Sequence, residues 1–150
     1  MARPAGPHPD ADPAVTVCFA VSIDDDDLGT FNSCDGLGIE VVLEQREEGG
    51  NNSLVWQLPT RLKYSNIKLS RPLSRDTLKI AAWFSDMVNG VVPKTATISA
   101  MTADRTVVAQ WGLYGVVPVR WTGPSLNLDS PKVATETVEI AHHGFMAPHG

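Results

Sequence analysis

The chain has 150 residues, of which 43% are hydrophobic and 19% charged, a length and composition that suit one globular domain with a sizeable core. Six of the seventeen acidic residues but only one of the twelve basic residues lie in residues 1–27, so the net charge of −5 belongs to the N-terminal segment. The remainder is balanced and has no basic cluster, which argues against sequence-specific nucleic-acid binding. No apolar run is long enough for a transmembrane helix, and the N-terminus lacks a signal-peptide pattern, so we expect neither a membrane anchor nor Sec export.

The N-terminal segment is predicted to be a flexible tail followed by a strand. Residues 1–13 are rich in Pro, Ala, His and Asp without periodicity, as in a tail. Alternating apolar residues from Val15 to Ile23 predict a half-buried strand. The four carboxylates Asp24 to Asp27 are interpreted as a turn kept in water rather than a metal site. Cys18 and Cys34 have neither metal-ligand nor CxxC spacing, which favours small buried apolar groups.

The stretch Gly29–Asn52 carries the most information. It predicts a hairpin over Leu28–Gln45, with a glycine-broken turn at Asp35–Gly38, followed by a mobile loop over residues 46–55. Strand alternation gives the second strand a polar side with Glu40, Val42, Glu44 and Arg46, and an apolar side with Ile39, Val41 and Leu43. We expect the apolar side to pack toward a second sheet and a helix, and the polar side to face water or a polar partner.

The middle of the chain predicts a bent strand and one helix. Extended structure resumes over Arg61–Leu69, where the parity of the apolar residues switches at Ser65–Asn66; a β-bulge or a strand that bends between two sheets would produce that switch. Residues Ser74–Asn89 predict the helix, with Ser74 as N-cap and Gly90 as the stop. Its apolar stripe consists of Ile80, Trp83, Phe84, Met87 and Val88.

Short strands fill the rest of the chain. Apolar alternation predicts them over Ala96–Met101, Val107–Leu113, Val117–Trp121 and Val133–His142. Many short strands with turn signals and one helix predict a mainly β fold, with two packed antiparallel sheets forming a sandwich or barrel and one flanking α-helix.

Motifs for catalysis or cofactor binding are absent from the sequence. There is no phosphate loop, dinucleotide fingerprint, zinc signature or nucleophile elbow. The most tempting site is His142–His143 with Glu136 and Glu139, but adjacent strand residues point to opposite faces and do not easily share a metal. We therefore expect no catalytic residue, no metal and no cofactor.

Four segments, in this order along the chain, resemble the phage tail tube protein family: Phe31–Asn52, Leu58–Arg71, Val117–Pro124 and Val133–Phe145. The likeness spans about residues 14–145 and is strongest toward inner tube proteins of extracellular contractile injection systems, which are phage-tail-like particles. It implies a tail-tube domain over residues 14–145, with flexible ends at 1–13 and 146–150.

This resemblance implies a structural protein without catalytic residues, with a ring-forming fold shared with the Hcp tube protein of type VI secretion. Six copies would close a ring around a channel, and rings would stack into a tube inside a contractile sheath that drives cargo through a target envelope. The implied partners are further copies of the chain as a homo-hexamer and stacked rings, the sheath protein, baseplate, spike and cap proteins, and a cargo protein in the lumen. The protein would be made in the cytoplasm and then held in an assembled particle.

Combined with the strand alternation, the resemblance predicts roles for the hairpin. Strands within Leu28–Arg46 and Leu62–Leu69 would line the lumen, and the polar side formed by Glu40, Val42, Glu44 and Arg46 would hydrate the channel. The ring-stacking or inter-subunit loop would consist of Glu47, Glu48, Gly49, Gly50, Asn51 and Asn52. Two alternatives stay open: a small β-barrel protein whose hairpin rims a ligand pocket, and a histidine-dependent hydrolase.

Overall fold

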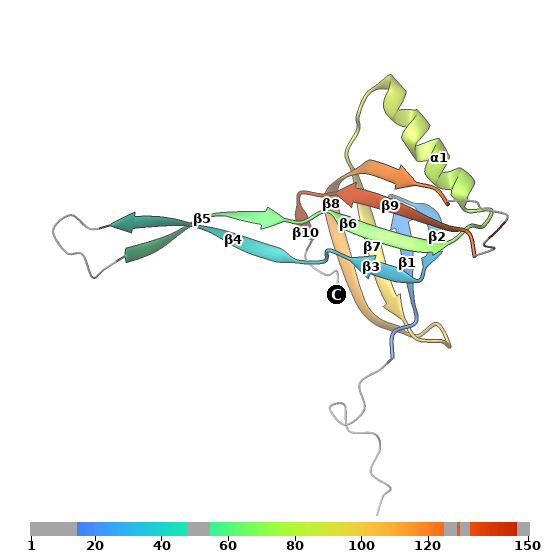
Figure 1. Ribbon diagram of the computed structural model, residues 1–150, viewed down its shortest axis with the longest axis horizontal. Helices are drawn as coiled ribbons and strands as arrows, with labels where there is room; N and C mark the ends of the chain where they lie inside the picture. Colours follow the sequence, from blue (N-terminus) through green and yellow to red (C-terminus); the bar gives the residue numbers. More distant parts are fainter. Residues whose placement is uncertain (1–14, 48–54, 125–128, 130–132, 147–150) are drawn as a thin grey trace, which may run out of the picture.

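The computed structural model describes residues 15–47, 55–124, 129 and 133–146 (Figure 1). The predicted tail at 1–13, the end at 147–150 and the Glu48–Asn52 part of the predicted loop lie outside the described residues. The strands are β1 Cys18–Ile23, β2 Asp26–Phe31, β3 Ser33–Asp35, β4 Ile39–Glu47, β5 Val55–Tyr64, β6 Ile67–Pro72, β7 Lys94–Met101, β8 Val107–Thr122, β9 Thr135–Ala141 and β10 Gly144–Met146. The helix α1 spans Thr77–Asp86, and the 3-10 helix η1 follows at Met87–Asn89.

The strands form a folded antiparallel sheet and a separate two-stranded arm. In the large sheet the strand order is β2-β1-β7-β8-β9-β6-β3, with β10 also paired to β8; β4 and β5 pair with each other. The long strand β8 belongs to both halves of the large sheet, because its first part pairs with β7 and its last part with β9. The predicted two-layer antiparallel fold with one helix is confirmed, and the layers do not close into a barrel.

The bend in β8 depends on Gly115. Its φ of +64° lies in the left-handed region, which a glycine adopts without the penalty that a Cβ brings. A Cβ at this position would also lie 2.4 Å from Cδ2 of His143. The bend brings the two layers face to face, and the side chains between them are almost fully buried. They include Val21, Ile98 and Leu113 from one layer and Leu69, Val138 and Ile140 from the other.

The helix covers one side of the two layers and is shorter than the sequence predicts (Figure 1). Ile80 and Trp83 of its predicted stripe are buried in the core, and Phe84 and Met87 are partly buried against it. Val88 is 87% exposed, so its place in the stripe was wrong. The chain tightens to 3-10 geometry after Asp86, which rotates Val88 off the apolar face.

Both predicted ends of the helix can be compared with the structure. The helix begins at Thr77 rather than near Ser74, whose hydroxyl oxygen instead accepts the backbone N–H of Asp76 at 3.2 Å. The predicted stop is confirmed, since Gly90 ends the 3-10 turn with φ at +124°. The predicted first strand was also too long, because β1 begins at Cys18.

The predicted hairpin over Leu28–Gln45 was wrong. Strand β3 pairs with β6, and β4 pairs with β5 across the connection 48–54. Gly36 has φ at +99°, and a Cβ added to it would lie 2.1 Å from the backbone oxygen of Asn66. A glycine at this position therefore lets the backbone approach the connection between β5 and β6 closely. The predicted change of sheet at Ser65–Asn66 is confirmed, since β5 belongs to the arm and β6 to the large sheet.

Candidate functional site: the projecting arm

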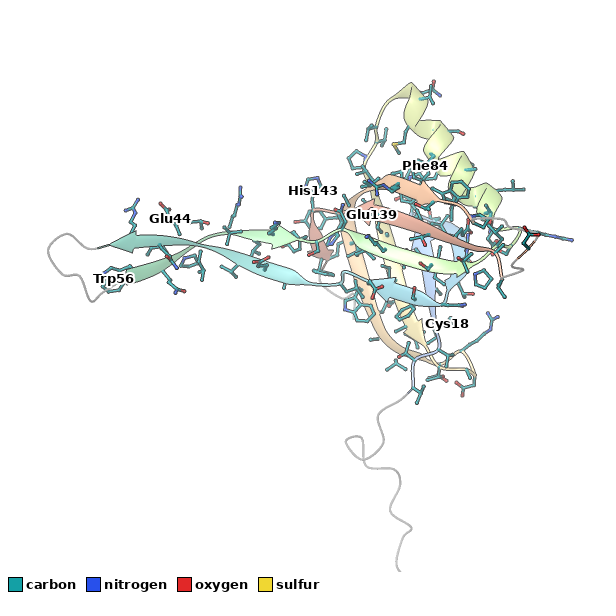
Figure 2. All side chains as sticks on the ribbon, in the orientation of Figure 1. Cys18, Glu44, Trp56, Phe84, Glu139 and His143 are labelled. Atoms are coloured by element: carbon teal, nitrogen blue, oxygen red, sulfur yellow. The ribbon has the colours of Figure 1, made fainter. Side chains whose placement is uncertain are left out.

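Strands β4 and β5 form an arm that extends far beyond the body of the protein (Figure 1). The end of β4 at Glu47 and the start of β5 at Val55 both fall inside the segment 46–55 that was predicted as a mobile loop. Figure 2 shows side chains on both sides of the arm, among them the labelled Glu44 and Trp56, which lie away from the body. The arm therefore presents both of its faces to the surroundings.

One face of the arm, here the apolar face, carries large aliphatic side chains. Ile39, Val41, Leu43 and Leu62 belong to it, because the register places Ile39 opposite Tyr64 and Val41 opposite Leu62. These four side chains are between 46% and 58% exposed. The expectation that this side packs toward the second sheet and the helix of the same chain was wrong, since the arm leads it away from both. Exposed apolar patches are typical of surfaces that contact another molecule.

The opposite face, here the charged face, carries the residues that the sequence singled out. Glu40, Val42, Glu44 and Arg46 alternate along β4, as predicted. Across the strand pair, Lys63 lies opposite Glu40 and Arg61 lies opposite Val42. Arg46 Nε and Glu44 Oε1 approach to 3.9 Å at an exposed position, which adds little stability in water.

Sequence reasoning missed the contribution of β5 to the charged face. Besides Arg61 and Lys63, the register places Leu58 opposite Glu44 and Trp56 opposite Arg46, so the outer end of this face is partly apolar. The register shifts between Val42 and Leu43, and the hydroxyl of Thr60 donates to the carbonyl of Val42 at 2.8 Å. Because of this bulge, Leu62 and Leu58 lie on opposite faces of the arm although they are four residues apart. Counting alternate residues along β5 does not reveal this change of face; the pairing with β4 does.

The body carries a polar sheet surface that is linked to the root of the arm. Pairing of β6, β9 and the last part of β8 gathers Lys68, Arg120, Thr122, Thr137 and Glu139 around a shallow hollow on the side opposite the core. Asn66 donates from Nδ2 to Glu139 Oε1 at 3.2 Å at the point where the arm meets the body. The inner part of the charged face and the sheet surface are thus both hydrophilic, as suits surfaces that meet water.

The histidine pair does not form the carboxylate–histidine arrangement considered from sequence. His142 is buried and His143 is exposed, as alternation predicts. Glu136 points into the interior, where its carboxylate accepts bonds from Arg71 Nε at 2.7 Å, Thr77 Oγ1 at 2.9 Å and Trp121 Nε1 at 2.9 Å. Both carboxylate oxygens are occupied by these donors, none of which is a histidine.

Other candidate sites can be located in the same way. Within the described ranges, no group of three or more His, Cys, Asp or Glu side chains comes together to hold a metal ion. Burial, and next the Asp35 carboxylate, raise the pKa of the Cys34 thiol to about 11, which keeps it unreactive. An open apolar groove of about 410 Å³ lies between α1 and Trp121 and is lined by no residue of the hairpin that the ligand-binding alternative would place at the rim of a pocket. None of the helices described is long and apolar enough to cross a membrane.

Comparison with known proteins gives a family match and several matching folds. Residues 15–146 match the family described as T4-like virus tail tube protein gp19. A chain in the extended sheath–tube complex of the extracellular contractile injection system PVC is 24% identical, with a TM-score of 0.75 over 89% of this chain and 90% of that chain. A chain in the PVC sheath/tube terminator is 23% identical, with a TM-score of 0.75 over 90% and 96%. A chain in the anti-feeding prophage tube-terminating cap is 23% identical, with a TM-score of 0.70 over 93% of each. No curated protein sequence matches the chain.

Proposed function

Because the chain belongs to the family of T4-like virus tail tube proteins, whose members are structural and not enzymes, we propose that it is the inner-tube subunit of a contractile injection system. Copies of the chain close into rings, and rings stack into a hollow tube. The baseplate of the anti-feeding prophage, in which a chain of the same fold occurs, is described with 6-fold symmetry. Six copies per ring is the corresponding expectation for this chain.

The exposed apolar face of the arm carries this proposal. A lone copy leaves Ile39, Val41, Leu43 and Leu62 about half exposed on a strand pair that projects into solvent. A two-stranded arm is marginal in water by itself. Burying the strip against a second copy removes it from water and fixes the arm, and the same contact repeated around a ring closes the assembly. Edge strands β2 and β3 of the large sheet offer further backbone groups for pairing with neighbours.

The hydrophilic surfaces give the tube its channel. The charged face, with Glu40, Val42, Glu44 and Arg46, lines the lumen together with the polar sheet surface of the body. Opposite charges lie side by side there, as in the Glu40–Lys63 pair, so the wall is hydrated without a strong field of one sign. Cargo then passes along a wall that is hydrated at its charged positions.

The remaining parts of the proposal concern the particle. Residues 14–145 form the tube domain, to which Met146 also belongs because it is the last residue of strand β10, and the segment Glu47–Asn52 contacts the next ring. The structural neighbours come from sheath–tube, terminator, cap and baseplate assemblies. By analogy with them, this chain contacts a sheath, a cap and a baseplate, and its lumen holds cargo. It is made in the cytoplasm and works as part of an extracellular particle.

The two faces of β4 provide a matched test, because Val41 and Val42 are neighbours of the same type on opposite faces. Val41→Glu places a carboxylate in the middle of the apolar face, where burial against a second copy would leave it without a partner. We expect this variant to remain folded and to form no rings. Val42→Glu adds a carboxylate to the charged face and should form rings as the wild type does.

Negative-stain microscopy and sedimentation velocity measure the outcome. Circular dichroism on the same samples confirms that both variants are folded. Rings formed equally well by Val41→Glu would show that the apolar face is not an interface. A wild-type chain that sediments as a compact monomer at high concentration would contradict the tube itself.

A further inference from the structure

The root of the arm is held to the body without strand pairing. Strand β5 ends at Tyr64, the chain crosses at Ser65–Asn66, and β6 begins at Ile67. Within the described residues β4 and β5 pair only with each other, so the arm continues no ladder of the large sheet. Figure 2 places the labelled His143 and Glu139 beside this junction. The direction of the arm therefore depends on the side chains packed at its root.

Three aromatic rings pack at this junction. The ring centroid of Tyr64, at the end of β5, lies 5.4 Å from that of His142, which follows β9, and 5.9 Å from that of Phe145 in β10. The ring centroids of His142 and Phe145 are 5.2 Å apart. The rings meet at angles of 50° to 70°, within the favoured range for aromatic contacts. His142 is thus one of the two aromatic side chains of the body that contact Tyr64 of the arm, and of the two only His142 can titrate.

The bonding of His142 suits a neutral imidazole. Its side chain is 8% exposed, its Nδ1 accepts the backbone N–H of Gly144 at 3.2 Å, and its Nε2 has no partner among the described residues. An imidazolium donates from both nitrogens, so protonation at Nδ1 would replace the hydrogen bond from Gly144 N–H by repulsion between two N–H groups. It would also place a charge in a buried aromatic setting. Burial, and to a smaller extent His143, lower the pKa of His142 against the backbone groups of Gly144 and Ser65, which raise it.

We propose that His142 is a pH-sensitive latch that fixes the arm to the body when neutral and releases it when protonated. Tyr64 from β5 and Phe145 from β10 pack against its ring, and the backbone groups of Ser65 and Gly144 act on it. The adjacent His143 is exposed on the opposite side of the chain. Glu139 lies on the opposite face of β9, where it holds Asn66. No carboxylate is among the described hydrogen-bond partners of His142; the backbone groups of Gly144 and Ser65 favour the charged form, and burial, which opposes it, is the larger effect on the pKa of His142.

The sign of the effect follows from proton linkage. In the released state His142 is solvated and titrates near its ordinary pKa of about 6.5. In the latched state the pKa of His142 is lower, so this state binds fewer protons. The latch is therefore complete above the ordinary pKa of about 6.5 and weakens as the pH falls below it. The ratio of latched to released arms then falls by up to roughly tenfold per pH unit. If the proposed ring is correct, acid loosens the assembly at the arm while the body stays folded.

Hydrogen exchange at the root tests the latch itself. The measurement uses the full chain carrying Val41→Glu, which keeps copies apart, at pH 7.5 and 5.5, with rates corrected for intrinsic pH dependence. We expect residues 62–66 and 142–146 to exchange several-fold to about tenfold faster at pH 5.5. His142→Phe keeps an aromatic ring without a titratable nitrogen and should abolish the response. The matched control His143→Phe, at the exposed neighbour, should retain it.

A second measurement needs no change at His142. In the His143→Phe background, NMR follows the His142 imidazole and the Tyr64 ring signals through one titration. A shared midpoint below about 6.5 supports the latch, whereas Tyr64 signals that ignore the titration overturn it. A pH response retained in His142→Phe also overturns it. Absence of wild-type rings at every pH would instead contradict the proposed function alone, because neither measurement of the latch requires a ring.

Discussion

Glu136 and Arg71 form a charge pair in the middle of the molecule. Glu136 has no exposed surface and Arg71 is nearly as buried. The guanidinium stacks 4.2 Å above the Phe31 ring, and its Nη1 donates to the carbonyl of Leu28. Two ions out of water are costly unless their hydrogen bonds are nearly complete. Here the pair joins β2, β6 and β9 to the start of the helix, so its loss affects several elements together.

Removing one member of this pair should be far more harmful than removing a surface carboxylate. Glu136→Ala leaves the buried guanidinium without its counter-ion, and we expect the free energy of unfolding to fall by about 3–5 kcal/mol. Glu139→Ala, three residues along the same strand on the outer face, should cost less than about 1 kcal/mol. Urea unfolding of both variants measures the difference. Equal midpoints would show that the interior pair contributes nothing beyond an exposed one.

Sequence could have indicated this pair but not its partners. Arg71 shares strand parity with the buried Ile67 and Leu69, and Glu136 shares parity with the buried Val138 and Ile140. Two opposite charges on inward positions of strands predict that each needs a buried partner. Parity alone does not say that β6 and β9 are neighbours, and that pairing is what places the two charges together.

At the scale of elements, the helix illustrates how packing corrects periodicity. Ile80 is buried in the core, whereas Val88 belongs to the 3-10 turn and faces solvent. Ile80→Ala should lower the free energy of unfolding by about 2–5 kcal/mol because it leaves a cavity. Val88→Ala should change it by less than about 0.5 kcal/mol. A large cost for Val88→Ala in urea unfolding would mean that the stripe extends through η1 after all.

The strands were recognisable from sequence, but their partners were not. Alternation separated the two faces of β4 and located inward positions of β7 and β9, because it reflects local backbone geometry. The hairpin over Leu28–Gln45 was wrong because Asp35–Gly38 has the residues of a tight turn. Gly36 instead permits a close approach to Asn66, a contact between residues far apart in sequence. Turn chemistry is local, whereas the choice of partner strand is decided by the packing of the whole domain.

At the scale of the whole molecule, the arm has an apolar face that its own chain does not cover. The sequence predicted two unlike faces on β4 but assigned the apolar one to the interior of its own chain. Alternation shows that a face must be covered without showing which body covers it. The structure leads this face out of the body, where a further copy is the proposed cover. Asn66 at the root of the arm donates to Glu139, which lines the polar hollow on β6, β9 and β8, and this link supports the proposed position of the charged face along a channel.

The position of the charged face can be tested by making it apolar. Glu40→Leu combined with Glu44→Leu removes two charges from the face that is proposed to meet water rather than protein. We expect rings and tubes to form, because the apolar face is unchanged, and the lumen to retain trapped protein or lose its cargo, because its wall has become adhesive. Glu40→Gln with Glu44→Gln is the control, since it removes the charges but keeps hydrogen-bonding groups and should leave the channel open. Electron microscopy of the tubes and mass spectrometry of their contents measure both effects. Failure of the leucine variant to form rings, with the glutamine variant intact, would place the charged face at a contact between copies and remove it from the channel.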